Sequence, residues 1–136
     1  MNLEHITYTG PEFDESSKII KALPDNLVSL LKQINGFVQF GGGLHLRGVC
    51  NEPEWHSIEN MINGPLTLHD AYPSIAVTDV PFAEDCVGDQ FLLRNRSVIK
   101  LYSETGEVEE YRFGLATFLN NVSENPVEFL GMEPLL

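Results

Sequence analysis

Histidine, cysteine and closely spaced acidic residues are the side chains of this 136-residue sequence that could perform chemistry. No serine lies in a Gly-x-Ser-x-Gly context, and neither cysteine has the setting of a nucleophile. The four histidines lack the spacing of a metal site, and we expect them at the surface or at helix ends: His5, His45, His56 and His69. We therefore predict no catalytic residue, no cofactor and no metal ion.

Asp85 and Asp89 flank Gly88 and could supply half of a divalent-metal site. They lack the regularly spaced oxygen ligands of a calcium loop, so we expect their carboxylates to stabilise a turn by hydrogen bonds. A small metal-dependent hydrolase that uses both aspartates and His69 stays open as an alternative. Cys50 and Cys86 have no metal-ligand spacing, and reduced thiols are favoured over a disulfide.

Acidic residues strongly outnumber basic ones, 20 against 8, for a formal net charge of -12. No Lys or Arg lies between Arg47 and Arg94, and none follows Arg112. Phosphate binding needs basic side chains, so neither direct nucleic-acid binding nor binding to an anionic membrane is expected. A basic protein partner would be attracted and its association accelerated. The alternative is that the acids only keep a small protein soluble.

No stretch approaches the ~18 consecutive apolar residues of a membrane helix. The first residues also lack the basic start and apolar core of a secretory signal. We therefore expect a cytoplasmic protein with a single domain over residues 1–136.

The element that must position these side chains is the stretch 80–111, whose apolar runs are separated by turn residues. Val80–Phe82, Phe91–Leu93, Val98–Tyr102 and the residues around Val108 predict an antiparallel meander. Phe91–Leu93 is expected to be a strand buried on both faces, and the acidic run around Val108 an edge strand. Tight turns are predicted at Asn95 and at Gly106.

Two helices are expected beside this meander. Leu27, Leu30, Leu31 and Ile34 form one apolar stripe after Pro24, and Leu115–Val122 forms another. Shorter elements are predicted at other positions: strands at 6–9, 44–47 and 75–77, and a helix at 53–62. The tail at 123–136 is too apolar for a solvated end, so we expect it to pack back on the domain.

Trp55, the only tryptophan, stands between Glu54 and His56. If buried, it is an ordinary core residue; if exposed, it is a candidate hot spot for a protein partner. We expect it to be partly buried.

Read as a set, these residues resemble the SUKH superfamily, which includes bacterial immunity proteins and fungal cell-wall assembly regulators. The opening signature is similar to Leu23-Pro24 followed by the leucine-rich helix and Asn35-Gly36-Phe37. The second signature is similar to 80–91, an apolar strand, an acid, a glycine, another acid and an aromatic strand. Tyr102, Gly106 and the Phe118-Leu119 helix complete a pattern that covers about 23–122. The triple glycine at 41–43 and the tail from Ser123 depart from it.

The resemblance implies an α+β fold, with a central antiparallel sheet of about four to six strands and helices packed on one side. It also implies a non-catalytic protein that binds and neutralises a cognate secreted toxin, often a nuclease. An acidic inhibitor can occupy the basic groove that a nuclease keeps for nucleic acid. The alternative is a regulatory scaffold that resembles the cell-wall regulators.

We expect the partner, a basic toxin domain, to contact the acidic side of the meander and the neighbouring tryptophan. The predicted contact residues are Glu52, Glu54, Trp55, Glu84, Asp85 and Asp89.

Overall fold

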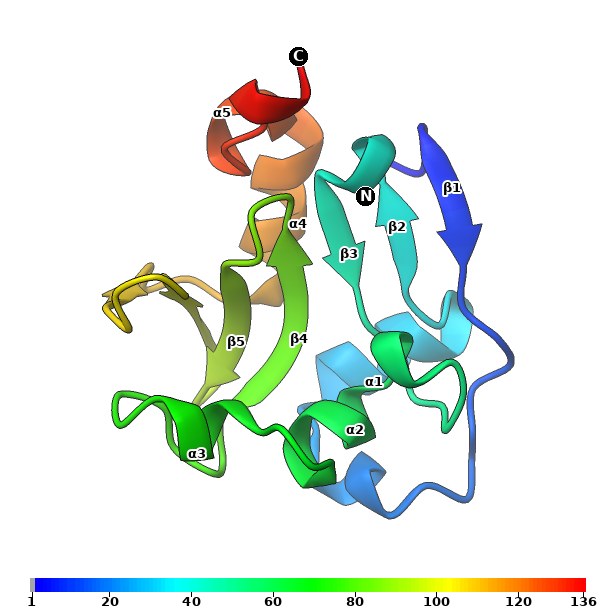
Figure 1. Cartoon of the computed structure of the whole chain (residues 1–136). Coiled ribbons are helices and arrows are strands. Elements are labelled where there is room, and N and C mark those ends of the chain that lie inside the picture. The colour runs from blue at the N-terminus through cyan, green and yellow to red at the C-terminus, as the bar shows by residue number, and fades with distance from the viewer. Residues whose placement is uncertain (1) are drawn as a thin grey trace.

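The computed structural model describes residues 2–136 as an α+β fold with a seven-stranded antiparallel sheet (Figure 1). The strands lie side by side in sequence order: β1 (Ile6–Thr9), β2 (Phe37–Gln39), β3 (Leu44–Leu46), β4 (Val80–Asp85), β5 (Gln90–Arg94), β6 (Ser97–Leu101) and β7 (Val108–Glu110). The predicted class is confirmed, but the prediction of four to six strands is too low. The sequence pattern gives no strand at β2, a three-residue segment that leads directly into the 3₁₀ helix Phe40–Gly42.

The helices are short and lie at both sides of this sheet. They are α1 (Asp25–Gln33), α2 (Ile58–Asn63), α3 (Leu68–Ala71), α4 (Leu115–Glu124) and α5 (Pro126–Phe129), with 3₁₀ helices at Lys18–Ala22, Phe40–Gly42, Glu54–His56 and Glu133–Leu135. Among residues 2–136 none of these helices has the length and apolar character needed to cross a membrane.

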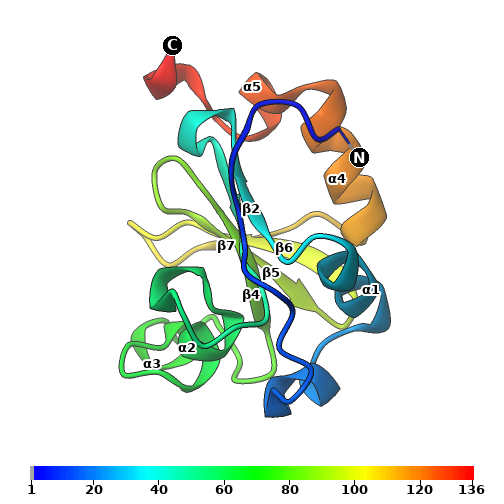
Figure 2. The ribbon, with the colours of Figure 1, turned by 90° about the vertical axis from the view of Figure 1, so that its right-hand side faces the viewer.

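The main hydrophobic core lies between one face of the sheet and the helices α1 and α4 (Figure 2). The predicted apolar stripes supply it, because Leu27 and Leu31 of α1 and Phe118 of α4 are completely buried. Aromatic rings pack at its centre, with the Phe91 and Phe118 ring centroids 4.9 Å apart. The two helices that the sequence predicts most clearly therefore build the core.

A second, smaller core lies on the opposite face of the sheet. Leu92, Ile99 and Leu101 are buried there, together with Ile75, and Leu68 of α3 packs against them. The prediction of helices on one side only is therefore wrong, because β5 and β6 are apolar on both faces and need a cover on each.

The predicted strand at 75–77 forms turns instead. The Asp79 side chain accepts a hydrogen bond from the Ala76 backbone N–H at 2.8 Å. The same carboxylate pairs with Arg94, with Nη2 to Oδ2 at 2.6 Å. These two interactions hold the segment as a turn at the end of β5.

The meander predicted for 80–111 is confirmed as β4 to β7. Asn95 and Arg96 adopt positive φ angles of 51° and 70° in the β5–β6 turn, and Gly106 has a φ of 79° in the β6–β7 turn. Phe91 and Leu92 are completely buried. β7 is an outer edge of the sheet, and its acidic side chains are exposed.

The C-terminal tail supplies side chains to the main core. Leu130 is completely buried and Met132 nearly so, and both belong to the main cluster. Leu136, six residues further on, is 84% exposed.

Candidate functional site

Two of the histidines, His45 and His56, are buried and in contact with each other. His45 lies on β3, and His56 ends the 3₁₀ helix Glu54–His56. His45 Nε2 lies 2.9 Å from His56 Nδ1, and the two rings stack with centroids 5.1 Å apart. The surface or helix-end position predicted for all four histidines is wrong for His45, which is a buried strand residue.

This contact is the middle of a longer chain of polar groups. At one end, His45 Nδ1 lies 3.1 Å from Oε1 of Glu84, its partner in the β3–β4 register. At the other end, His56 Nε2 lies 2.8 Å from the backbone oxygen of Asn35. We call Glu84, His45, His56 and the Asn35 carbonyl the histidine chain.

Glu84 is held by further donors on its second oxygen. Gln90 Nε2 lies 3.0 Å from Oε2, and Arg47 Nη2 lies 3.5 Å from it. The His45 hydrogen bond, the Arg47 charge and the Gln90 hydrogen bond together lower the pKa of Glu84 to about 2, against the opposing effect of burial. The Glu84 carboxylate is therefore ionised at neutral pH.

Arg47 itself is almost completely buried. It donates hydrogen bonds to the Pro81 carbonyl and to the Gln90 side chain, while its Nε has no partner among residues 2–136. Burial lowers the pKa of the Arg47 guanidinium, and the charge of Glu84 opposes this. The buried cation balances the Glu84 carboxylate.

Two glycines make room for the His56 ring. A Cβ on Gly36, which has a φ of 79°, would lie 2.6 Å from the ring, and one on Gly10 would lie 2.5 Å from Nε2. Asn35 is held beside it, because its side chain bonds Val49 and the Pro11 carbonyl. The site is therefore tightly packed around the imidazole.

Trp55 lies directly over the histidine chain. Its ring centroid is 4.9 Å from that of Tyr8, 5.2 Å from that of His45 and 5.5 Å from that of His56. These rings support part of the indole, yet Trp55 is 55% exposed. It is therefore a large aromatic side chain on a fixed support with more than half of its surface open to solvent.

Acidic residues neighbour this tryptophan in the chain and through His45, whose ring it contacts. Glu52 and Glu54 are exposed in the segment that leads into it, and the Glu84 side chain is 31% exposed. We call Tyr8, Glu52, Glu54, Trp55 and Glu84 the Trp55 surface. Four of the six predicted contact residues belong to it.

Asp85 and Asp89 stand apart from the Trp55 surface. Asp85 Oδ1 accepts hydrogen bonds from the backbone N–H groups of Val87 and Asp89, and Asp89 Oδ1 accepts one from Ser103. The predicted turn-stabilising role is confirmed for both. Asp85 also pairs with Lys100 at 3.5 Å, and its side chain is only 2% exposed. Its predicted place on a contact surface is therefore wrong, because its carboxylate is used inside the protein.

The residues of the metal-dependent alternative bind other partners. His69 lies 3.5 Å from the Thr67 hydroxyl, which donates to Asp70. Within residues 2–136, no group of three or more His, Cys, Asp or Glu side chains is placed to hold a metal ion. Cys50 and Cys86 are unpaired in this part of the chain.

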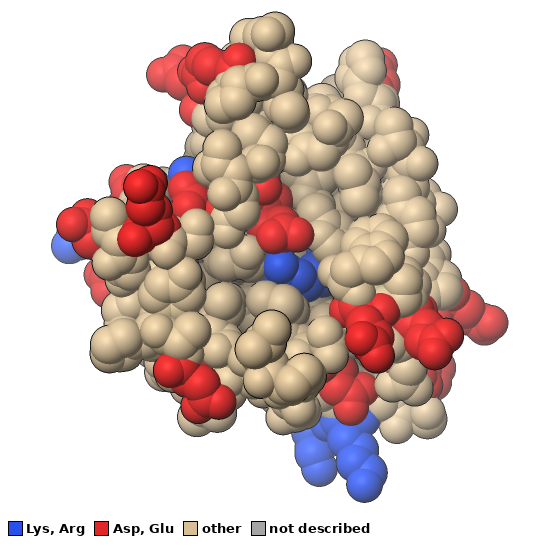
Figure 3. All heavy atoms as spheres, viewed as in Figure 1, with Lys and Arg blue, Asp and Glu red and all other residues tan. Residues whose placement is uncertain are grey.

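Charge is unevenly spread over the face that carries α2, α3 and β4. Figure 3 shows acidic side chains over much of its left half and around its lower right part. Basic atoms gather at the bottom edge, with a few at the left and a small group at the centre of a hollow beside acidic atoms. Acidic side chains therefore cover more of this face than basic ones, while its upper right part carries few charges.

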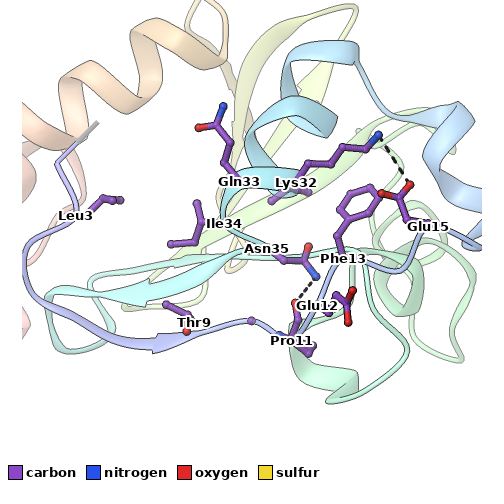
Figure 4. A pocket seen from close by; sticks show the side chains of 12 residues that line it. Leu3, Thr9, Pro11, Glu12, Phe13, Glu15, Lys32, Gln33, Ile34 and Asn35 are labelled. Atoms are coloured by element: carbon purple, nitrogen blue, oxygen red, sulfur yellow. Dashed lines mark hydrogen bonds and ion pairs between the residues drawn. The ribbon is translucent and has the colours of Figure 1, made fainter.

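An open groove of about 600 Å³ lies beside α1 (Figure 4). Leu3 and Ile34 lie toward one end and Phe13 and Lys32 toward the other. Lys32 pairs with Glu15 across 3.8 Å, and both side chains are more than half exposed. Lys32 and Glu15 therefore form a solvated surface ion pair in this groove.

Sequence reasoning misses the histidine chain for a definite reason. His45 and Glu84 become partners only through the β3–β4 register, and no local pattern gives a register between strands 39 residues apart. One usable signal is the alternation in 44–47, which puts His45 and Arg47 on one face of a strand.

Comparisons with known proteins do not place this chain in a family. The chain matches no protein-family model, no curated protein and no solved structure. The resemblance to the SUKH superfamily stays a prediction that rests on the residues given above.

Proposed function

We propose that this protein is a non-catalytic binding domain that neutralises a basic protein partner, in the manner of an immunity protein that inhibits a cognate toxin. The Trp55 surface is the proposed contact. The observation that carries the proposal is the exposed tryptophan on a fixed aromatic support. Large aromatic side chains that are already ordered lose little conformational entropy on binding, and they dominate the energy of many protein interfaces.

Charge supports a basic partner. Glu52 and Glu54 are exposed beside Trp55, and the whole chain has a formal net charge of -12. Charged groups at the rim of an interface raise the association rate of an oppositely charged partner. A toxin that binds nucleic acid would present such a basic surface.

The test is binding to the product of the gene next to the one that encodes this chain. Biolayer interferometry at several salt concentrations gives association and dissociation rates for the wild type and for Trp55→Ala. We expect the substitution to weaken affinity about 30-fold or more, mainly through faster dissociation. Leu66→Ala is the matched control, because Leu66 is an apolar residue that is 86% exposed outside the Trp55 surface.

A second pair of variants tests the charge. Glu54→Lys should slow association and flatten its salt dependence, while Glu104→Lys, in the β6–β7 turn, should change both less. Absence of binding to the neighbouring product, or equal affinities for Trp55→Ala and the wild type, would remove the proposal.

A further inference from the structure

The histidine chain has three contacts, and each needs a hydrogen atom between its two heavy atoms. They are Glu84 Oε1 to His45 Nδ1 at 3.1 Å, His45 Nε2 to His56 Nδ1 at 2.9 Å, and His56 Nε2 to the Asn35 oxygen at 2.8 Å. A carboxylate and a carbonyl only accept hydrogen bonds. The three hydrogens must therefore come from the two imidazole rings.

Two neutral imidazoles carry only two N–H groups. Any choice of their tautomers leaves one of the three contacts as two facing lone pairs. If both end contacts are made, His45 Nε2 and His56 Nδ1 face each other without a hydrogen. If the central contact is made, either Glu84 or the Asn35 carbonyl faces a bare ring nitrogen.

We infer that the pair His45–His56 holds a third proton at neutral pH, so that one of the two rings is an imidazolium. The proton resides on His45, which then donates to Glu84 and to His56, while neutral His56 donates to Asn35. Burial favours the same placement, because it lowers the pKa of His56; the hydrogen bond to the Asn35 carbonyl opposes this, and the charges of His45 and Arg47 lower the pKa further.

The charged and titratable groups that face this pair come from every neighbouring element. Arg47 of the segment after β3 and Glu84 of β4 are charged, and Tyr8 of β1 lies against the His56 ring at 5.1 Å. Burial raises the pKa of the Tyr8 hydroxyl, with a contribution from Cys50, so it stays neutral. With the third proton, the group formed by Glu84, His45 and Arg47 carries a net charge of +1, because Arg47 already balances the Glu84 carboxylate.

This protonation has a consequence for partner binding, and that consequence rests on the proposed function. Glu84 is neutralised inside the protein, so Glu52 and Glu54 supply the attraction for a basic partner. Release of the third proton at alkaline pH removes one positive charge next to the Trp55 surface, and association with a basic partner then becomes faster.

The protonation is measured on the free protein, without any partner. Long-range ¹H–¹⁵N spectra of the histidine rings, recorded between about pH 5 and pH 9, report which ring nitrogens carry hydrogen. We expect both nitrogens of His45 to be protonated at pH 7, and only Nε2 of His56. The exposed ring of His5 supplies a reference spectrum. A neutral His45 at pH 7 would overturn the inference.

Glu84→Gln is a sharper variant of the same test. A glutamine amide can donate to His45 Nδ1 while its oxygen still accepts from Gln90 and Arg47, so it supplies the third hydrogen itself. We expect His45 to become neutral, with its hydrogen on Nε2. An imidazolium that persists in a folded Glu84→Gln protein contradicts the role of Glu84. If the variant does not fold, the wild-type spectra still decide the proton count.

A binding experiment tests the consequence for the partner separately. The association rate of the basic partner should rise with pH for the wild type and stay flat for Glu84→Gln. A charged His45 without any partner binding would leave the inference standing and remove the proposed function. Partner binding together with a neutral His45 would overturn the inference and leave the proposed function standing.

Discussion

Leu130 offers a direct test of how the C-terminal tail is held. Leu130→Ala removes three carbon atoms from a side chain that is completely buried in the main core. Large-to-small changes at such positions cost about 3 kcal/mol, from lost apolar burial and from the cavity left behind. For a chain of 136 residues, with about 2.1 cal/mol/K of unfolding entropy per residue, this lowers the melting temperature by about 10 °C.

Leu136→Ala is the matched control in the same tail, because that side chain is 84% exposed. Its effect should lie within about 0.5 kcal/mol of the wild type. Both variants are measured by urea unfolding followed by circular dichroism, with calorimetry for the melting temperature. Equal stabilities for the two variants would refute the packing of the tail into the core.

Three further predictions follow from the site and the meander. The carboxyl carbon of Glu84 should titrate near pH 2 by ¹³C NMR, so its contribution to stability is present above about pH 4.5 and is lost as pH falls toward 2. Gly36→Ala should destabilise the protein by about 2 kcal/mol or more in urea unfolding, because a side chain at φ 79° is strained and would overlap the His56 ring. The hydrogen bond to Glu109, with burial, raises the pKa of Tyr102 to about 12, and Glu109→Gln should lower that value in an ultraviolet titration.

The fold can be predicted from the sequence where local patterns are long. The leucine stripe in 27–34 and the apolar runs in 80–102 have the period of a helix and of strands, and they form these elements. Ile75–Val77 also has the composition of a strand but forms turns, because Asp79 accepts a hydrogen bond from the Ala76 backbone and is itself held by Arg94, which is 15 residues further along the chain. Local propensity gives way there to tertiary contacts.

The candidate site could be predicted only in part. Trp55 and its neighbouring glutamates stand together in the sequence, so their shared surface follows from the chain order. Asp85 is an acidic residue like these, yet it is buried and pairs with Lys100. It follows Glu84 in β4, and successive strand residues point to opposite faces. The pairing of His45 with His56 depends on the way the segment that ends in the 3₁₀ helix Glu54–His56 folds over β3, and the sequence gives no sign of it.

The proposed contact with a protein partner is tested most directly by hydrogen exchange of the chain alone and in its complex with the neighbouring gene's product. We expect binding to slow amide exchange in three segments, residues 6–9, 52–57 and 82–85, which carry the Trp55 surface. Protection confined to the groove beside α1 or to β6 and β7, with these three segments unchanged, would contradict it.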